Sequence, residues 1–191
     1  MTKQKSMIQI DPESFDISIY ETLMATSVIQ SYKKGALLVE EGRICSYLFL
    51  VEEGLLRSFF YDKKGNDVTH WFAAETMMLT APASFFNREE SFFSIQALED
   101  TVVRAITLDA LEDAFEQSKS LERFGRIFAT EMLILFGHKI IDLQTKSAED
   151  RYRELLQKYP DIFQRTKLGH IASYLGIAQQ SLSRIRANVR L

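Results

Sequence analysis

The spacing of apolar residues changes at Asp109 and divides the chain into a strand-rich part and a helical part. From about Ser31 to that point the sequence is dense in β-branched and aromatic residues and is broken by glycines, a pattern typical of short strands. After Asp109, apolar residues recur at intervals of three and four, as on one face of a helix. A helical pattern also covers the first 30 residues, with Phe15, Ile19 and Leu23 on one face. The chain is therefore predicted to be an α+β protein.

Two short turns interrupt the strand-rich part. Lys63–Asn66 has the composition of a hairpin turn, and Glu99–Thr101 separates two further strand-like runs. Several short strands at this spacing predict a small antiparallel barrel or jelly roll, which forms a first domain over residues 1–120. Eight apolar residues of this part could line an apolar pocket, or could be core residues or loop anchors, and core is the favoured interpretation: Trp71, Phe72, Met77, Met78, Phe85, Phe86, Phe92 and Phe93.

Residues 121–145 predict a long helix that is apolar on more than one face. A helix of this kind must be covered on several sides. One face can pack on the barrel, and the other is predicted to pack on a second copy of the chain in a two-fold dimer. A wholly internal core helix is the alternative. Lys146–Asp150 then interrupts the pattern as a hinge, with Ser147 or Asp150 capping the next helix.

The segment Thr166–Arg190 predicts two short helices joined at Gly176, with the second helix at about 178–188. Residues 146–191 contain nine Lys/Arg and four Asp/Glu, a local charge of +5, whereas the rest of the chain has a charge of −8. A basic segment on an acidic body indicates where an anionic partner would bind. Residues 146–191 are therefore predicted to be a helix-turn-helix domain that binds double-stranded DNA.

Composition also limits the cellular compartment in which the protein is expected. Cys45 is the single cysteine, which excludes an internal disulfide and suits a cytoplasmic protein, and its thiol is interpreted as a small apolar filler. No apolar run approaches the roughly 20 residues that span a membrane, and no apolar segment follows the N-terminal lysines as in a secretory signal. We therefore expect a cytoplasmic protein with no membrane partner.

The three histidines, His70, His138 and His170, lack the spacing of metal ligands. A cupin-like enzyme would hold a metal between clustered histidines and a carboxylate, and this alternative also leaves the last helices unexplained. We therefore expect no metal, no cofactor and no catalytic residues.

Barrel, long helix and helix-turn-helix, in this order, resemble the Crp/Fnr (catabolite activator) family of bacterial transcription regulators. The resemblance is carried by glycine spacing in the barrel, by the strand after the family's phosphate-binding cassette, and by the two last helices: Lys34-Gly35, Glu41-Gly42, Tyr47–Val51, Gly54, Gly65, Ser94–Asp100, Ile171–Ile177 and Ser181–Arg186. It implies a dimeric, sequence-specific DNA-binding regulator whose barrel responds to a small-molecule effector, with RNA polymerase as a candidate partner.

The resemblance also implies roles for residues of the last helices. Side chains at the start of the second helix and one turn later would read base edges: Gln179, Gln180 and Arg184. A second group would contact phosphates: Lys167, Ser181, Arg186 and Arg190. Four apolar residues would form the scaffold: Ile171, Leu175, Leu182 and Ile185. The alternative is a ligand-binding or protein-interaction module that no longer binds DNA.

The cassette departs from that of cyclic-nucleotide-binding relatives, in which a glutamate binds the ribose and an arginine–serine pair binds the phosphate. No glycine precedes Glu75, and the expected arginine–serine positions hold Ser91 and Phe92, with Arg88 the nearest arginine. A buried phosphate needs a cation and aligned donors. The usual cyclic AMP contacts are therefore not expected. The effector site stays unassigned, within a region that includes Glu75, Arg88 and Ser91.

Overall fold

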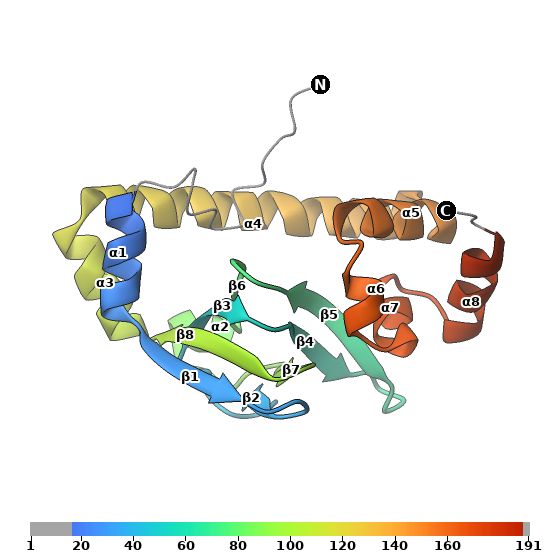
Figure 1. Ribbon diagram of the computed structural model, residues 1–191, viewed down its shortest axis with the longest axis horizontal. Coiled ribbons are helices and arrows are strands. Elements are labelled where there is room, and N and C mark those ends of the chain that lie inside the picture. The colour runs from blue at the N-terminus through green and yellow to red at the C-terminus, as the bar shows by residue number, and fades with distance from the viewer. Residues whose placement is uncertain (1–16, 189–191) are drawn as a thin grey trace, which may run out of the picture.

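The computed structural model describes residues 17–188, and its strands form two antiparallel sheets of four (Figure 1). The strands are β1 (Val28–Tyr32), β2 (Leu37–Val39), β3 (Leu48–Glu53), β4 (Leu56–Tyr61), β5 (Asp67–Ala73), β6 (Met78–Leu79), β7 (Ser94–Ala97) and β8 (Thr101–Ile106). One sheet has the order β1-β8-β3-β6 and the other β2-β7-β4-β5. Among the described residues the two sheets do not close into a barrel. Of the two predicted architectures, barrel and jelly roll, the structure therefore has the one that is built from two sheets.

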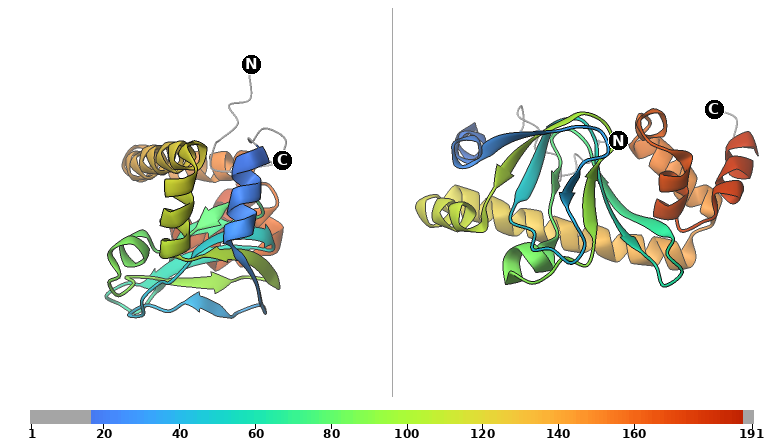
Figure 2. Two further views of the ribbon diagram at one scale, coloured as in Figure 1. Left: turned by 90° about the vertical axis from the view of Figure 1, so that its left-hand side faces the viewer. Right: turned by 90° about the horizontal axis from the view of Figure 1, so that it is seen from below.

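Eight helices complete the described part of the chain. They are α1 (Ile17–Thr26), α2 (Pro82–Asn87), α3 (Leu108–Gln117), α4 (Lys119–Thr145), α5 (Ala148–Lys158), α6 (Ile162–Arg165), α7 (Leu168–Tyr174) and α8 (Gln179–Asn188). The α+β prediction is therefore confirmed. Helix α4 has 27 residues, runs along the sheets and ends beside the C-terminal helices, as Figure 1 and the right-hand view of Figure 2 show.

The two predicted turns and the predicted cap are present. Between β4 and β5, the carboxylate of Asp62 accepts the backbone N–H groups of Lys64 at 2.8 Å and Asn66 at 2.9 Å. Glu99 and Asp100 lie between β7 and β8. Ser147 caps α5, because its hydroxyl accepts the N–H of Asp150. These local predictions succeeded because side chains of the turns themselves supply the hydrogen bonds.

The first core fills the space between the sheets and the helices α1, α3 and α4. Of the eight apolar residues with two interpretations, Trp71, Phe72, Met77, Met78 and Phe85 are buried. The prediction of core was wrong for Phe86 and Phe92, which are 55% and 72% exposed. Phe86 lies on α2, where the neighbouring Phe85 takes the buried position, and Phe92 lies in the loop between α2 and β7. Cys45 is fully buried, as expected of a filler.

A second cluster of buried residues joins the C-terminal helices to the two sheets. Leu55, Phe72 and Leu98 belong to the strand region, and they pack with Tyr152, Leu155, Ile162, Ile171, Ala172, Leu175 and Leu182 from α5–α8. The C-terminal unit, residues 148–188, is therefore docked on the strand region.

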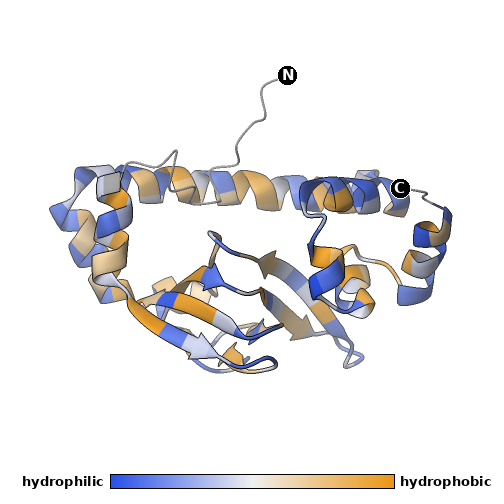
Figure 3. Cartoon of the chain, in the orientation of Figure 1, coloured by the Kyte–Doolittle hydropathy of each residue, from blue (hydrophilic) through white to orange (hydrophobic). Residues whose placement is uncertain are grey.

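Helix α4 exposes apolar side chains on the face turned away from the sheets. Leu133, Ile134, Ile140 and Ile141 are all more than two-fifths exposed. Leu133 and Ile140, like Ile134 and Ile141, are seven residues apart, which aligns them on one stripe. Figure 3 shows that apolar residues recur along the whole helix. Within residues 17–188, none of the helices combines the length and apolarity that crossing a membrane requires.

Candidate functional site

Helices α7 and α8 are joined by a turn that fixes the direction of α8. Gly176 adopts φ +69°, a left-handed conformation that a residue with a Cβ rarely takes. Its N–H donates to Ser173 O, and the N–H of Ile177 donates to Ala172 O, both at 3.0 Å. These two bonds form a Schellman motif, the commonest glycine ending of a helix.

The underside of the α7–α8 pair is buried as predicted. Leu182 is fully buried, Ile171 is 1% exposed and Leu175 is 3% exposed, while Ile185 packs partly against them. Burying one such side chain contributes about 1.5–3 kcal/mol. The scaffold roles of these four residues are confirmed, and they leave the opposite face of α8 free of packing.

The exposed face of α8 carries the residues predicted to contact DNA. Gln179, Gln180, Ser181, Arg184 and Arg186 are all exposed. Within the described part of the chain, no carboxylate forms an ion pair with Arg184 or Arg186, so both charges are available to an anion.

Lys167 is the exposed N-cap residue of α7. Lys167 directly precedes α7, so it lies at the N-terminal end of the unit that α7 and α8 form. Arg190 falls outside the described residues.

Glu75 of the cassette region binds an arginine of the C-terminal unit. Its carboxylate accepts two hydrogen bonds from Arg165, at 2.6 Å and 2.8 Å, and a third from the N–H of Gly54. Arg165 also donates to Glu99, at 2.5 Å and 3.1 Å. The bonds from Arg165 hold the pKa of Glu75 below its usual range. The glutamate that the resemblance relates to a ribose is thus part of an ionic cluster between the strand region and the C-terminal unit.

Arg88 and Ser91 lie apart from this cluster. Arg88 ends α2 with φ +58° and pairs with Asp109, the second residue of α3, at 2.9 Å. Ser91 is 3% exposed and donates its hydroxyl to the carbonyl of Phe93. The three residues named for the effector region therefore point to three different partners rather than to one ligand.

Helix α7 contacts β5 directly. The N–H of Thr69 donates to the hydroxyl of Ser173 at 3.0 Å. Tyr174 packs against Phe72, with ring centroids 5.3 Å apart. From α4, the ammonium of Lys139 donates to the carbonyl of His70 at 2.5 Å and lies 3.7 Å from the centroid of the Tyr174 ring. Burial lowers the pKa of Lys139 to about 7.

The histidines do not cluster. His70 stacks on Phe136, His170 contacts the hydroxyl of Thr166, and His138 is exposed on α4. In residues 17–188 no group of three His, Cys, Asp or Glu side chains lies close enough to hold a metal ion.

Sequence reasoning missed Arg165, Glu99 and Lys139. Arg165 meets Glu99 and Glu75 across 66 and 90 residues of chain. Periodicity and turn signals report only local structure, so no pattern in the sequence could pair these residues. The one signal that the sequence offered for Arg165 was its basic side chain at the end of a short helical segment.

Residues 29–118 match the family model of the cyclic nucleotide-binding domain. A search of curated proteins gives no match. The matched range runs from β1 to α3, so the likeness lies in the strand region and the helix that follows it.

Solved structures extend the likeness to the C-terminal unit. FixK2 from Bradyrhizobium japonicum is 20% identical, with 85% of this chain and 83% of that chain aligned at a TM-score of 0.72. The Thermus thermophilus catabolite activator protein is 17% identical, with 94% and 89% aligned at 0.60. A protein from Eubacterium rectale assigned to the Crp/Fnr transcriptional regulators is 20% identical, with 92% and 84% aligned at 0.66. The chain thus has the fold of Crp/Fnr regulators, and the resemblance seen in the sequence is confirmed.

Proposed function

We propose that this protein is a dimeric transcription regulator that reads DNA with the exposed face of α8. The observation that carries the proposal is that polar and cationic face, held on a buried apolar underside by the Gly176 turn. A helix fixed in this way can enter the major groove with its N-terminal residues against base edges. The fold shared with Crp/Fnr regulators supports the same assignment.

The proposed roles follow from side-chain chemistry. Gln179 and Gln180 can pair with adenine through their amides, and Arg184 can pair with the O6 and N7 atoms of guanine. Lys167, Ser181 and Arg186, with Arg190, would contact phosphates and set the register without reading sequence.

Dimerisation through α4 completes the proposal. A single two-helix unit makes too few contacts for tight specific binding, whereas a dimer reads two half-sites. The stripe of Leu133, Ile134, Ile140 and Ile141 offers a surface that a second α4 can cover. The proposed division is therefore a sensor domain over 1–120, a dimerisation helix over 121–145 and a DNA-binding domain over 146–191.

The sensor is proposed to respond to an effector by contacts other than those usual for cyclic AMP. Arg88 is paired with Asp109, and the hydroxyl of Ser91 is used by the backbone. Neither group is arranged to hold a phosphate. RNA polymerase is a further proposed partner, and no catalytic role is proposed.

Replacing Arg184 with alanine tests the proposal. Loss of a bidentate base contact costs about 1–3 kcal/mol, so Arg184→Ala is expected to weaken specific binding by about 10- to 100-fold in a gel-shift titration at fixed salt. Arg43→Ala is the matched control, since it removes the same charge from an exposed position in the sensor. Equal operator affinity in both variants would contradict the assignment and favour a module that does not bind DNA.

A further inference from the structure

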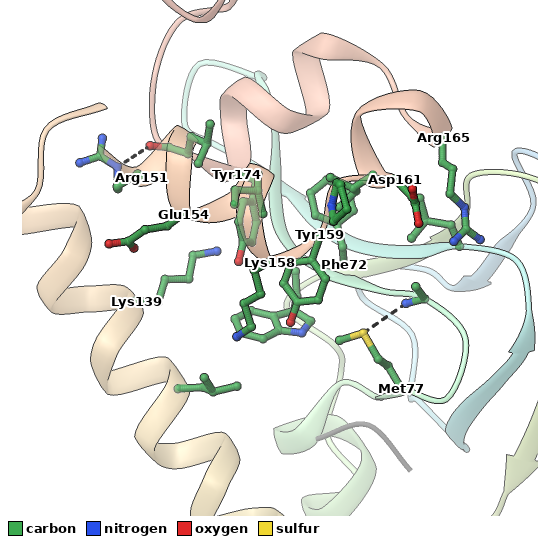
Figure 4. Close-up of a pocket in the computed structure, with 18 of the residues that line it drawn as sticks. Phe72, Met77, Lys139, Arg151, Glu154, Lys158, Tyr159, Asp161, Arg165 and Tyr174 are labelled. Atoms are coloured by element: carbon green, nitrogen blue, oxygen red, sulfur yellow. Dashed lines mark hydrogen bonds between the residues drawn. The ribbon is translucent and has the colours of Figure 1, made fainter. Parts of the chain in front are cut away.

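A cavity of about 630 Å³ lies where three parts of the molecule meet. Its walls come from β5 and the loop before β6, from the second half of α4, and from the helices α5–α7 (Figure 4). Cavities of this size bind small molecules in many proteins. Glu75 of the cassette region lines it, whereas Arg88 and Ser91 do not, so the cavity adjoins that region on the side of the C-terminal unit.

One wall of the cavity is aromatic. Phe72 packs on Tyr174, and Trp71 meets Tyr174 edge to face with ring centroids 6.3 Å apart. Trp71 is 7% exposed, and its indole N–H has no acceptor among the described residues. Buried indole N–H groups usually find an acceptor. The wall therefore offers flat apolar contact, and the indole N–H itself is buried behind it.

Two ammonium groups accompany the aromatic wall. Lys139 lies 3.7 Å from the ring centroid of Tyr174 and 5.4 Å from that of Trp71. Lys158 comes from α5, and its ammonium lies 5.3 Å from the ring centroid of Tyr159, another residue of the lining (Figure 4). In residues 17–188, neither lysine has a carboxylate within ion-pair distance.

Three of the four carboxylates that line the cavity are held in ion pairs. Glu75 pairs with Arg165, which also pairs with Glu99. Asp142 and Glu154 both pair with Lys146, at 2.9 Å and 2.7 Å. Each of these two cations is shared by two carboxylates, and none of the three lining carboxylates pairs with Lys139 or Lys158.

The remaining charged groups of the lining are Arg151 and Asp161. Arg151 donates to backbone carbonyls, including that of Leu175 at 3.1 Å, so its charge meets no carboxylate in the described part of the chain. Asp161 is the single lining carboxylate without an ion pair there. The lining thus has four cations and four carboxylates, but Lys139 and Lys158 have no carboxylate partner in the described part of the chain. These two lysines favour a ligand with an anionic group.

We propose that this cavity binds a small aromatic anion. The ring lies against Trp71 and Tyr174, and the anionic group meets Lys139 and Lys158. Such a ligand touches the sensor sheet, α4 and the C-terminal unit at once, so it holds the three together. This site is independent of DNA binding by α8.

Trp71 is the single tryptophan of the chain, so its fluorescence reports binding in the cavity. The probe is anilinonaphthalene sulfonate, an aromatic anion whose own emission rises in an apolar site. The matched neutral probe is phenyl-naphthylamine, which has the same rings without the sulfonate. In titrations of the full chain we expect saturable one-to-one binding of the sulfonate with quenching of Trp71. The neutral probe is expected to bind about tenfold more weakly.

Lysine variants locate the anionic group. Lys139→Met and Lys158→Met are each expected to weaken binding of the sulfonate by about tenfold and to leave binding of the neutral probe unchanged. Lys158 is exposed, so its variant keeps the fold intact. Lys119→Met, on the exposed start of α4, is the control and should bind like the original protein. Equal binding of the two probes, unchanged binding in both lysine variants, or loss of the signal in Phe92→Ser, which alters only an exposed surface, would overturn the proposal.

Discussion

Two partly buried histidines make the stability of this protein sensitive to acid. Burial, and then the charge of Lys139, lowers the pKa of His70 from 6.5 to about 4. Burial, followed by the charge of Arg57, lowers the pKa of His170 to about 4 as well. Between pH 6.5 and pH 4 the unfolded chain therefore binds more protons than the folded one. The stability that these neutral histidines contribute is complete above pH 6.5 and is lost as the pH falls through that window.

Substitution of His70 tests this account. His70→Phe keeps an aromatic ring against Phe136 and removes the titrating group. We expect the melting temperature of the original protein to fall between pH 7 and pH 5, and that of His70→Phe to fall less. His138→Phe, at an exposed position of α4, is the control and should keep the original slope. Identical slopes in all three proteins would contradict the role of His70.

At the residue scale, the sequence predicted the part of the site that local patterns describe. Leu182 and Ile171 were identified as scaffold because helical spacing places them on one face, and both are buried. The partners of Glu75 could not be predicted in the same way. Its position near a strand end was readable, but its bond to Arg165 depends on how the C-terminal unit docks.

At the scale of single elements, α4 is the helix that is expected to form the dimer interface. Ile140→Glu places a charge on the exposed apolar stripe, and burying an unpaired carboxylate in a dimer seam costs several kcal/mol. We expect the dimer to dissociate to monomers, measured by light scattering after size-exclusion chromatography. Ile29→Glu is the matched control, because Ile29 is 59% exposed on β1 and Ile140 is 58% exposed. A dimer that survives Ile140→Glu unchanged would show that another surface joins the copies.

Most helices and strands could be predicted from the sequence, but the way in which the strands pair into sheets could not. The start of α4 was expected at Leu121 and lies at Lys119, while α8 begins one residue after the expected 178. The prediction of a barrel left open which strands pair at the edges. Val28 pairs with Ala105, and such long-range pairing leaves no mark on local periodicity. The two-sheet arrangement therefore had to come from the structure.

At the scale of the whole molecule, the cluster of Arg165 with Glu75 and Glu99 holds the C-terminal unit on the sensor. Arg165→Met leaves both carboxylates without their cation, and a charge-assisted hydrogen bond contributes about 1.5–3 kcal/mol. Glu75 is two-fifths exposed, so solvent screening reduces this figure. We expect the docked arrangement to open more often by about tenfold.

Hydrogen exchange of the Thr69 amide measures this opening, because that amide donates to Ser173 across the same interface. Exchange is expected to be about tenfold faster in Arg165→Met. Arg153→Met is the control, since Arg153 pairs with Glu149 within α5 and not across the interface. Equal protection of the Thr69 amide in both variants would mean that apolar packing alone holds the C-terminal unit in place.

Selection of bound sequences from a random pool of double-stranded DNA tests the central claim most directly. A dimer that places two copies of α8 in successive major grooves should enrich a palindrome with half-sites about one helical turn, roughly 10 base pairs, apart. The Arg184→Ala variant should lose this enrichment at the base pair that Arg184 reads. Failure of the original protein to enrich any sequence over the starting pool would contradict the account.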